Sequence, residues 1–372
     1  MKQSLIKRRL VQAKMIEGEA CLSLHRSLQR SIRETAAQDS TIMQNVFNQA
    51  LILVRKAFPA STPTQVPDPS SWRGHQRLLP HVMSLQSAFV EAKSAIPGSK
   101  KFAGLLSDAG VNQWACGFTR DGLLLLTTAE VVLDSVQIDA FNEMRADINA
   151  FIALMHDNTG ISTRAESLRR RQFTLGVRRT QIDSLPQVSQ VEDTLLYNAW
   201  LDYAISLLQY NRYQEVETVL DKCLEKYREW GSPDEIPYEY AKYGHKMGLI
   251  RMYQGRWEEA LELCQNGVQH MDKTGNDSLM LRFKFDLACI HLQKGDIEQS
   301  LVIHKQVLNQ RIRVCGKVNE NTLQSYYAIG ALEELLGNYA EAEQVSPLFP
   351  SISPSLQCLM LHTTTILPMC YM

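Results

Sequence analysis

A cluster of arginines is the part of the sequence best suited to bind an anion. Arg164, Arg170, Arg171 and Arg178 are spaced so that several of them share one side of a helix. Guanidinium groups bind carboxylates and phosphates through paired hydrogen bonds. This basic stripe therefore suits an acidic peptide or a phosphate. The alternative interpretation is an exposed helix face that balances acidic neighbours such as Glu166.

A second set of polar side chains is placed to hold an extended peptide. In a stack of helical hairpins the first helix of each hairpin faces the concave side, where Asn and Lys side chains can bond a peptide backbone and its carboxylates. We expect this role for Asn198, Tyr240, Lys242, Tyr243 and Lys284. The predicted partner is a protein or a peptide.

Sequence motifs of catalysis are absent. The chain contains no GxSxG, HExxH, GxGxxG or GxxxxGK[ST] motif. Its 9 histidines fall at different places, and its 8 cysteines form neither a CxxC pair nor a zinc-finger spacing. We therefore expect no enzymatic activity, no cofactor and no metal.

Charge and hydropathy argue against two other classes of partner. Lys and Arg number 39 and Asp and Glu number 40, a balance that gives no reason to expect nucleic acid or an anionic membrane. The N-terminus has no apolar leader, and no run of about 18 apolar residues suits a membrane span. Scattered cysteines are typical of reduced compartments. These features predict a cytoplasmic protein.

Small residues recur around a regular series of turns. The turns are placed 43, 51, 44, 40 and 42 residues apart, at Gly117, Gly160, Asn211, Gly255, Gly295 and Gly337. Seven residues before them stand Gly110, Ala153, Ala204, Gly248, Ala288 and Gly330. Five residues after them stand Gly122, Ala165, Val216, Ala260, Ser300 and Ala342. Two helices can approach closely only where side chains lack bulk, so the pattern predicts an all-α superhelix of about six helix pairs.

The sequence divides into five predicted segments. The first sixty residues indicate a basic helix over 1–14, a hairpin over 15–25 around Glu17-Gly18 and a helix over 41–58, which together suggest a winged helix. Prolines then mark a connector, followed by a helix at about 75–95. The predicted segments are 1–58, winged-helix-like; 59–73, Pro-rich linker; 74–190, two degenerate repeats; 191–344, clear repeats; and 345–372, an uncharged irregular tail.

The tail breaks the repeat pattern. It lacks Asp, Glu, Lys and Arg, and Pro347 and Pro350 would stop the helix that begins at Tyr339. We expect the last pair to be truncated, with Leu332, Leu335 and Leu336 partly uncovered. The tail is an apolar cap, a weak membrane anchor, or a translated intron, since Gln344-Val345-Ser346 matches an exon end followed by a splice donor.

Several segments resemble fungal STAND-type NTPases with tetratricopeptide repeats (TPR). EIPYEYAKYGHKMGLIRMYQGRWEEALEL and TLQSYYAIGALEELLGNYAEAE resemble their repeats, and the longer period is similar to that of kinesin light chains. LSLHRSLQRSI and KAFPASTPTQVPDP resemble the winged-helix region and linker of the same family. The resemblance implies a TPR interaction module and, in full-length relatives, an upstream nucleotide-binding domain. This sequence departs from the family because it has no phosphate loop.

The function favoured by these patterns is a non-catalytic protein-interaction scaffold of STAND-like type. Two alternatives stay open: an accessory or regulatory protein of a fungal specialised-metabolite pathway, and a DNA-associated regulator. The second would use the basic residues of the N-terminal segment, Lys7, Arg8, Arg9 and Lys14, to touch phosphates.

Overall fold

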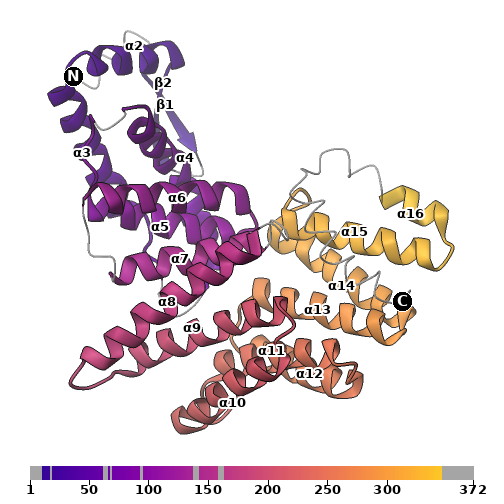
Figure 1. The fold of residues 1–372 in the computed structure, drawn as a ribbon. Helices are drawn as coiled ribbons and strands as arrows, with labels where there is room; N and C mark the ends of the chain where they lie inside the picture. Colours follow the sequence, from indigo (N-terminus) through magenta and orange to yellow (C-terminus); the bar gives the residue numbers. More distant parts are fainter. Residues whose placement is uncertain are drawn as a thin grey trace.

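The chain folds into a curved stack of antiparallel helix pairs (Figure 1). The computed structural model describes residues 11–345 except 17–18, 62–65, 68, 93–94, 137–141 and 158–162. These described residues form one β-hairpin and fifteen helices, labelled α2 to α16. The expected all-α superhelix is confirmed.

The first described residues form a β-hairpin. Strands β1, Val11–Ile16, and β2, Glu19–Leu24, pair antiparallel with Ile16 opposite Glu19. The hairpin expected around Glu17-Gly18 is confirmed and begins earlier than expected. The helix expected over 1–14 is wrong for residues 11–14, which belong to β1, because VQAKMI pairs along its length with the second strand. Residues 1–10 lie outside the described residues.

Two helices follow the hairpin, α2, Arg26–Ala37, and α3, Ser40–Ala57. Asp39 caps the N-terminus of α3, because its carboxylate accepts hydrogen bonds from the N–H groups of Thr41 and Ile42. The Phe47 ring of α3 packs edge-on against Phe102 with centroids 5.1 Å apart. Residues 40–57 therefore share one hydrophobic core with the first repeats. The winged-helix interpretation of 1–58 stays a prediction.

Helix α4, Pro69–Glu91, begins inside the segment that we expected to be linker. Proline is favoured in the first turn of a helix, where its missing N–H would have no partner. The buried face of α4 includes Trp72, Val82 and Leu85, of which Val82 and Leu85 belong to the same N-terminal core. The connector between α3 and α4 is thus residues 59–68, shorter than expected.

Six helix pairs make up the rest of the stack. In chain order they are α5, Lys100–Ala115, with α6, Thr119–Ser135; α7, Glu143–Asp157, with α8, Arg164–Ser184; α9, Gln190–Gln209, with α10, Tyr213–Trp230; α11, Pro237–Tyr253, with α12, Trp257–Asp272; α13, Asp277–Lys294, with α14, Ile297–Cys315; and α15, Glu320–Leu335, with α16, Tyr339–Val345. The pair boundaries agree with the turns expected from the sequence.

The predicted turn residues adopt left-handed backbone conformations. Five of them have positive φ, namely Gly117, Asn211, Gly255, Gly295 and Gly337. Such a residue ends a helix by turning the chain sharply, and only glycine and, to a lesser degree, asparagine tolerate it. The sixth, Gly160, lies outside the described residues.

Small residues let the helices of a pair approach closely. A Cβ atom on Gly122 of α6 would lie 2.9 Å from the carbonyl oxygen of Gly110 on α5. At the equivalent place in a later pair, the Ser300 hydroxyl of α14 donates a hydrogen bond of 2.7 Å to the carbonyl oxygen of Ala288 on α13. The positions chosen from the sequence are therefore the crossing points of these two pairs.

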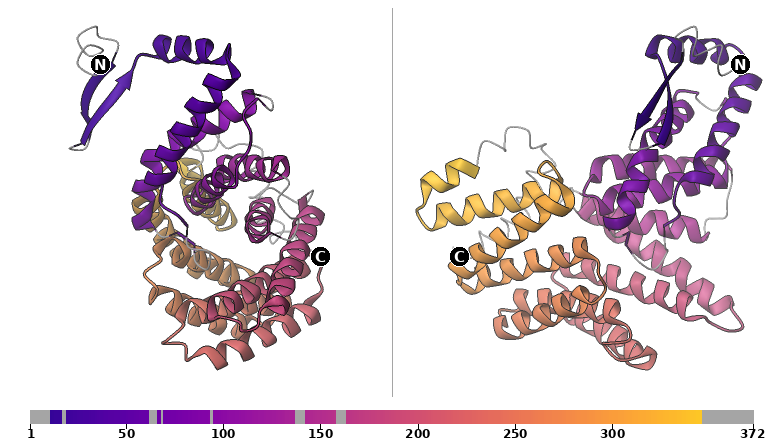
Figure 2. Two further views of the ribbon diagram at one scale, coloured as in Figure 1. Left: turned by 90° about the vertical axis from the view of Figure 1, so that its left-hand side faces the viewer. Right: turned by 180° about the vertical axis from the view of Figure 1, so that it is seen from behind.

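The curvature of the stack brings its two ends together. The Asn319 side chain, before α15, donates a hydrogen bond to the carbonyl oxygen of Cys116, at the α5–α6 turn. The Thr119 N–H donates to the Glu320 carboxylate at 3.2 Å. Two views from other sides show how the helix pairs wrap round between these contacts (Figure 2). The first and last of the six helix pairs are therefore in direct contact.

The last described pair is short. Helix α16 ends at Val345, and residues 346–372 lie outside the described residues. Leu335 is exposed, as expected, and Leu336 is half-buried. Leu332 is buried against Leu301 and Ile329, so its expected exposure is wrong because α14 covers it.

A glycine-to-alanine comparison tests the helix crossing. Gly122→Ala should lower the free energy of unfolding by about 1–3 kcal/mol, since the new methyl group meets a backbone oxygen that cannot move alone. Gly176→Ala is the matched control because nothing lies within 4 Å of its added Cβ, and it should stabilise the exposed helix by up to about 1 kcal/mol. Urea unfolding followed by circular dichroism measures both. A Gly122→Ala chain as stable as wild type contradicts the crossing.

Candidate functional site

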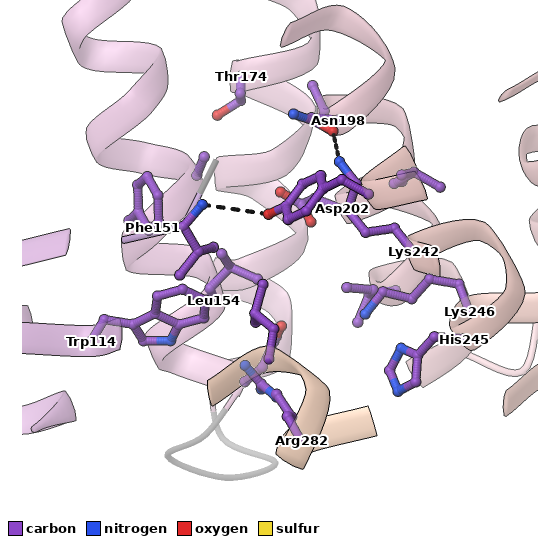
Figure 3. A pocket seen from close by; sticks show the side chains of 18 of the residues that line it. Trp114, Phe151, Leu154, Thr174, Asn198, Asp202, Lys242, His245, Lys246 and Arg282 are labelled. Atoms are coloured by element: carbon purple, nitrogen blue, oxygen red, sulfur yellow. Dashed lines mark hydrogen bonds between the residues drawn. The ribbon is translucent and has the colours of Figure 1, made fainter. Parts of the chain in front are cut away.

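A cavity of about 320 Å³ lies on the inner face of the stack. Its walls come from α7, α9, α11 and α13, the first helices of four successive pairs, together with residues of α5 and α8 and one residue of the connector. We call it the inner groove. Figure 3 shows side chains from these helices pointing toward one another across it.

One wall of the inner groove is apolar. Trp114 and Phe151 pack edge-on with ring centroids 5.7 Å apart, and Leu154 lies beside them. The Arg282 guanidinium lies 5.6 Å from the centroid of the Trp114 ring. A cation at this distance is attracted to the face of the indole. The wall can thus accept an apolar side chain next to a positive charge.

Two of the predicted groove residues, Asn198 and Lys242, line the inner groove and contact each other. The Lys242 ammonium donates a hydrogen bond to the Asn198 side-chain oxygen, drawn in Figure 3. It also lies 4.5 Å from the centroid of the Tyr238 ring. Burial lowers the pKa of Lys242, while the charges of Glu239 and Asp202 partly restore it. Both residues line the groove, but their role in binding stays a prediction.

The other three predicted groove residues lie elsewhere. The Tyr240 hydroxyl donates to the carbonyl oxygen of Gly231 at 3.1 Å, and Tyr243 packs beside the core of the α9–α11 region. Lys284 is half-buried on α13 and does not line the groove. The reason is helical periodicity, because a residue two positions from a groove residue points about 200° away from it.

The basic stripe is not an exposed surface, contrary to both interpretations of the sequence. Arg171 is 1% exposed and bonds Asp157 and, at 2.8 Å, the Ser206 hydroxyl. Arg178 is 5% exposed and bonds Asp147.

The remaining members of the stripe are also held within the fold. Arg170, 8% exposed, bonds Glu130 at 2.9 Å and the Asn149 side chain at 2.7 Å. Arg164 is half-buried, and its guanidinium reaches the carbonyl oxygen of Gln209 at 3.5 Å. Because carboxylates of neighbouring helices already pair with three of the four arginines, their first role is to join helices.

Three charged side chains of the groove were missed from the sequence. Lys246, Arg282 and Asp202 line it, and neither a hydrogen bond nor an ion pair joins any of them to another described residue. Burial and the nearby Arg282 together lower the pKa of Lys246 to about 8, although the charges of Asp202 and Asp286 oppose the shift. Burial likewise raises the pKa of Asp202. Lys246 and Asp202 are half-buried, whereas Arg282 is exposed. Partial burial of a charged group without a close partner destabilises the fold, so the retention of Lys246 and Asp202 indicates a use.

A histidine and a carboxylate form the floor beside them. His245 Nε2 lies 2.7 Å from an Asp286 carboxylate oxygen, and its ring stacks on Phe283 with centroids 4.1 Å apart. Burial lowers the pKa of His245, although Asp286 opposes this. The sequence contained a signal that could have found Lys246. On α11 the groove residues Tyr238, Lys242 and Lys246 recur every four positions and so share one helix face.

Residues 279–345 match the tetratricopeptide repeat family. NprR in complex with its cognate peptide NprX aligns with a TM-score of 0.58 at 13% identity, over 92% of this chain and 91% of that chain. Rap protein complexed with Competence and Sporulation Factor aligns with 0.50 at 12% identity, over 90% and 98%. Kinesin-light-chain-like repeats of Podosopora anserina align with 0.39 at 16% identity, over 58% and 95%. No curated protein matches the chain.

Replacing Lys246 tests how its partly buried charge affects the stability of the fold. Below about pH 8 the Lys246 ammonium is charged in both states, so its burial destabilises the fold. This free-energy cost is lost as pH rises from the folded pKa of about 8 toward the unfolded pKa of about 10.5. Lys246→Met should therefore stabilise the chain at pH 7, on the order of 1 kcal/mol, and much less at pH 10.

Urea unfolding at the two pH values measures this difference. Lys284→Met is the matched control, since this half-buried lysine of α13 lies outside the groove, and its effect should be small and similar at both pH values. Destabilisation by Lys246→Met at pH 7 contradicts the interpretation of Lys246 as an unsatisfied charge.

Proposed function

We propose that this chain is a non-catalytic scaffold whose inner groove binds an extended peptide segment of a partner protein. The observation that carries the proposal is the pair of cations, Lys246 and Arg282, that line the groove and form no ion pair or hydrogen bond with a described residue, although Asp286 lies near both. A peptide carboxylate placed between them would supply a directly bonded partner. The ligand class is therefore a peptide with an acidic side chain or a free C-terminus.

The groove offers contacts for the rest of such a peptide. The apolar wall around Trp114 and Phe151 suits a large hydrophobic side chain. The Asn198 amide can bond a peptide backbone when Lys242 turns toward a carboxylate. Asp202 and Asp286 add negative charge, which disfavours a second acidic group nearby.

Two similar structures support the peptide class of ligand. NprR was solved with its cognate peptide and Rap protein with Competence and Sporulation Factor. At 13% and 12% identity these likenesses concern the fold, and the ligands belong to those proteins. The support for peptide binding here is the concave inner surface, lined in this chain by charged and aromatic side chains.

The described residues offer few features for other activities. They contain no group of three His, Cys, Asp or Glu side chains placed to hold a metal ion. Nor does any helix in the described ranges have the length and apolar character needed to cross a membrane. The DNA-associated alternative depends mainly on residues 1–10, outside the description. The STAND-like origin, the fungal pathway and the cytoplasmic location are proposals that rest on sequence resemblance and composition.

Charge reversal in the groove tests the proposal. The full chain is screened against short synthetic peptides that combine one acidic group with large apolar residues, and binding is measured by fluorescence anisotropy. Lys246→Glu and Arg282→Glu should each weaken the selected peptide about tenfold or more, because each removes a charged contact worth about 1.5–3 kcal/mol.

Lys284→Glu, on the same helix as Arg282 but outside the groove, is the matched control and should change affinity less than about twofold. Equal affinity of wild type and both groove variants contradicts the proposed site. So does a screen in which no such peptide binds the wild-type chain.

A further inference from the structure

One residue of the chain's own connector lies in the inner groove. Val66 lines it, although its two hydrogen-bonding partners are 172 and 210 positions away in sequence. The Val66 N–H donates to the Tyr238 hydroxyl at 3.4 Å. Its carbonyl oxygen accepts from the Asn276 side-chain amide at 3.2 Å. Both main-chain groups of one residue are thus bonded by two different helix pairs.

The two partners are held in place before they meet Val66. Asn276 is 7% exposed and caps α13, because its side-chain oxygen accepts the Leu279 N–H at 3.1 Å. Its amide NH₂ must then point away from the helix, toward Val66. Tyr238 is 8% exposed, and its ring is fixed beneath the Lys242 ammonium.

The side chains of Tyr238 and Asn276 together recognise a main chain and not a side chain. A hydroxyl and a carboxamide that bond the N–H and C=O of one extended residue would do so for almost any sequence. The Val66 side chain adds an apolar contact with the N-terminal core that contains Trp114. Val66 therefore makes contacts of the kind that an extended peptide from a partner would make.

We propose that Val66 of the connector is an internal ligand of the inner groove, which a partner peptide must displace. The inference rests on the proposed function, since it names the regulation of the same site. Two neutral hydrogen bonds contribute only about 1 kcal/mol each, so the contact is weak by itself. It persists because the connector is tethered by α3 and α4, which gives it an effective concentration in the millimolar range.

Competition follows from this tether. A ligand that must bond Tyr238 and Asn276 can bind only those molecules in which Val66 has left them. Its apparent affinity for the intact chain is therefore reduced in proportion to the fraction of molecules in which the two side chains are free. The start of the connector is anchored separately, because the Ser61 N–H donates to the Asp108 carboxylate at 3.1 Å. Release of Val66 therefore leaves the anchor on α5 in place.

A peptide with the connector sequence tests the proposal directly. The probe is fluorescein-labelled STPTQVPDP, residues 61–69, measured by fluorescence anisotropy against two full-length chains. One is wild type. The other carries an alternating Gly/Ser sequence of equal length in place of residues 61–68. The probe should bind the Gly/Ser chain at least tenfold more tightly than wild type, because Tyr238 and Asn276 are then free.

Asn276→Asp in the Gly/Ser chain is the matched variant. It keeps the oxygen that caps α13 but replaces the donating NH₂ by an oxygen that repels the Val66 carbonyl, so probe binding should fall about tenfold. Equal binding to wild type and the Gly/Ser chain overturns the proposal, as does unchanged binding after Asn276→Asp. Failure of the folded Gly/Ser chain to bind overturns it as well.

A second measurement tests the proposal without the Gly/Ser chain, and so applies even if that chain does not fold. Hydrogen–deuterium exchange of the segment containing Val66 should be slower in wild type than in the Tyr238→Phe and Asn276→Asp chains. Unchanged exchange overturns the proposal. These readouts are separate from the acidic peptides and from Lys246 and Arg282, so failure of the connector proposal and failure of the proposed function can be told apart.

Discussion

The close approach of paired helices at small residues is the constraint on which the rest of this structure depends. Where Gly110 faces Gly122, backbone meets backbone, and no methyl group fits between. The larger apolar side chains are thereby displaced to the surfaces between pairs, which a single pair cannot bury alone. Stacking of the pairs follows, and with it a continuous inner face made of first helices.

Buried ion pairs then determine how the pairs sit on one another. Arg171 of α8 bonds Asp157 of α7 and Ser206 of α9, so that one guanidinium joins two pairs. Breaking such a contact would leave a buried charge without a partner, which is strongly unfavourable. The stack is closed by the contact of Asn319 with the α5–α6 turn. Pairing and closure together give the inner groove its width.

The inner groove holds both paired and unpaired charges. Arg178 and Asp147 form an ion pair at its edge, whereas Lys246, Arg282 and Asp202 form no ion pair or hydrogen bond within the described ranges. The Val66 main chain is bonded there by side chains from two helix pairs. A groove that holds unsatisfied charges beside an internal peptide segment is well suited to exchange that segment for another one.

The sequence by itself determined the helix pairs, their left-handed turns and their crossing points, because these depend on local periodicity and on the size of single residues. Of the residues predicted to hold a peptide, Asn198 and Lys242 line the inner groove, whereas Tyr240, Tyr243 and Lys284 lie outside it, and their roles in binding stay predictions. The expected exposed stripe of arginines is mostly buried. Only the tertiary structure decided these points, and the position of Val66, because the partner of a side chain depends on how distant pairs curve toward one another.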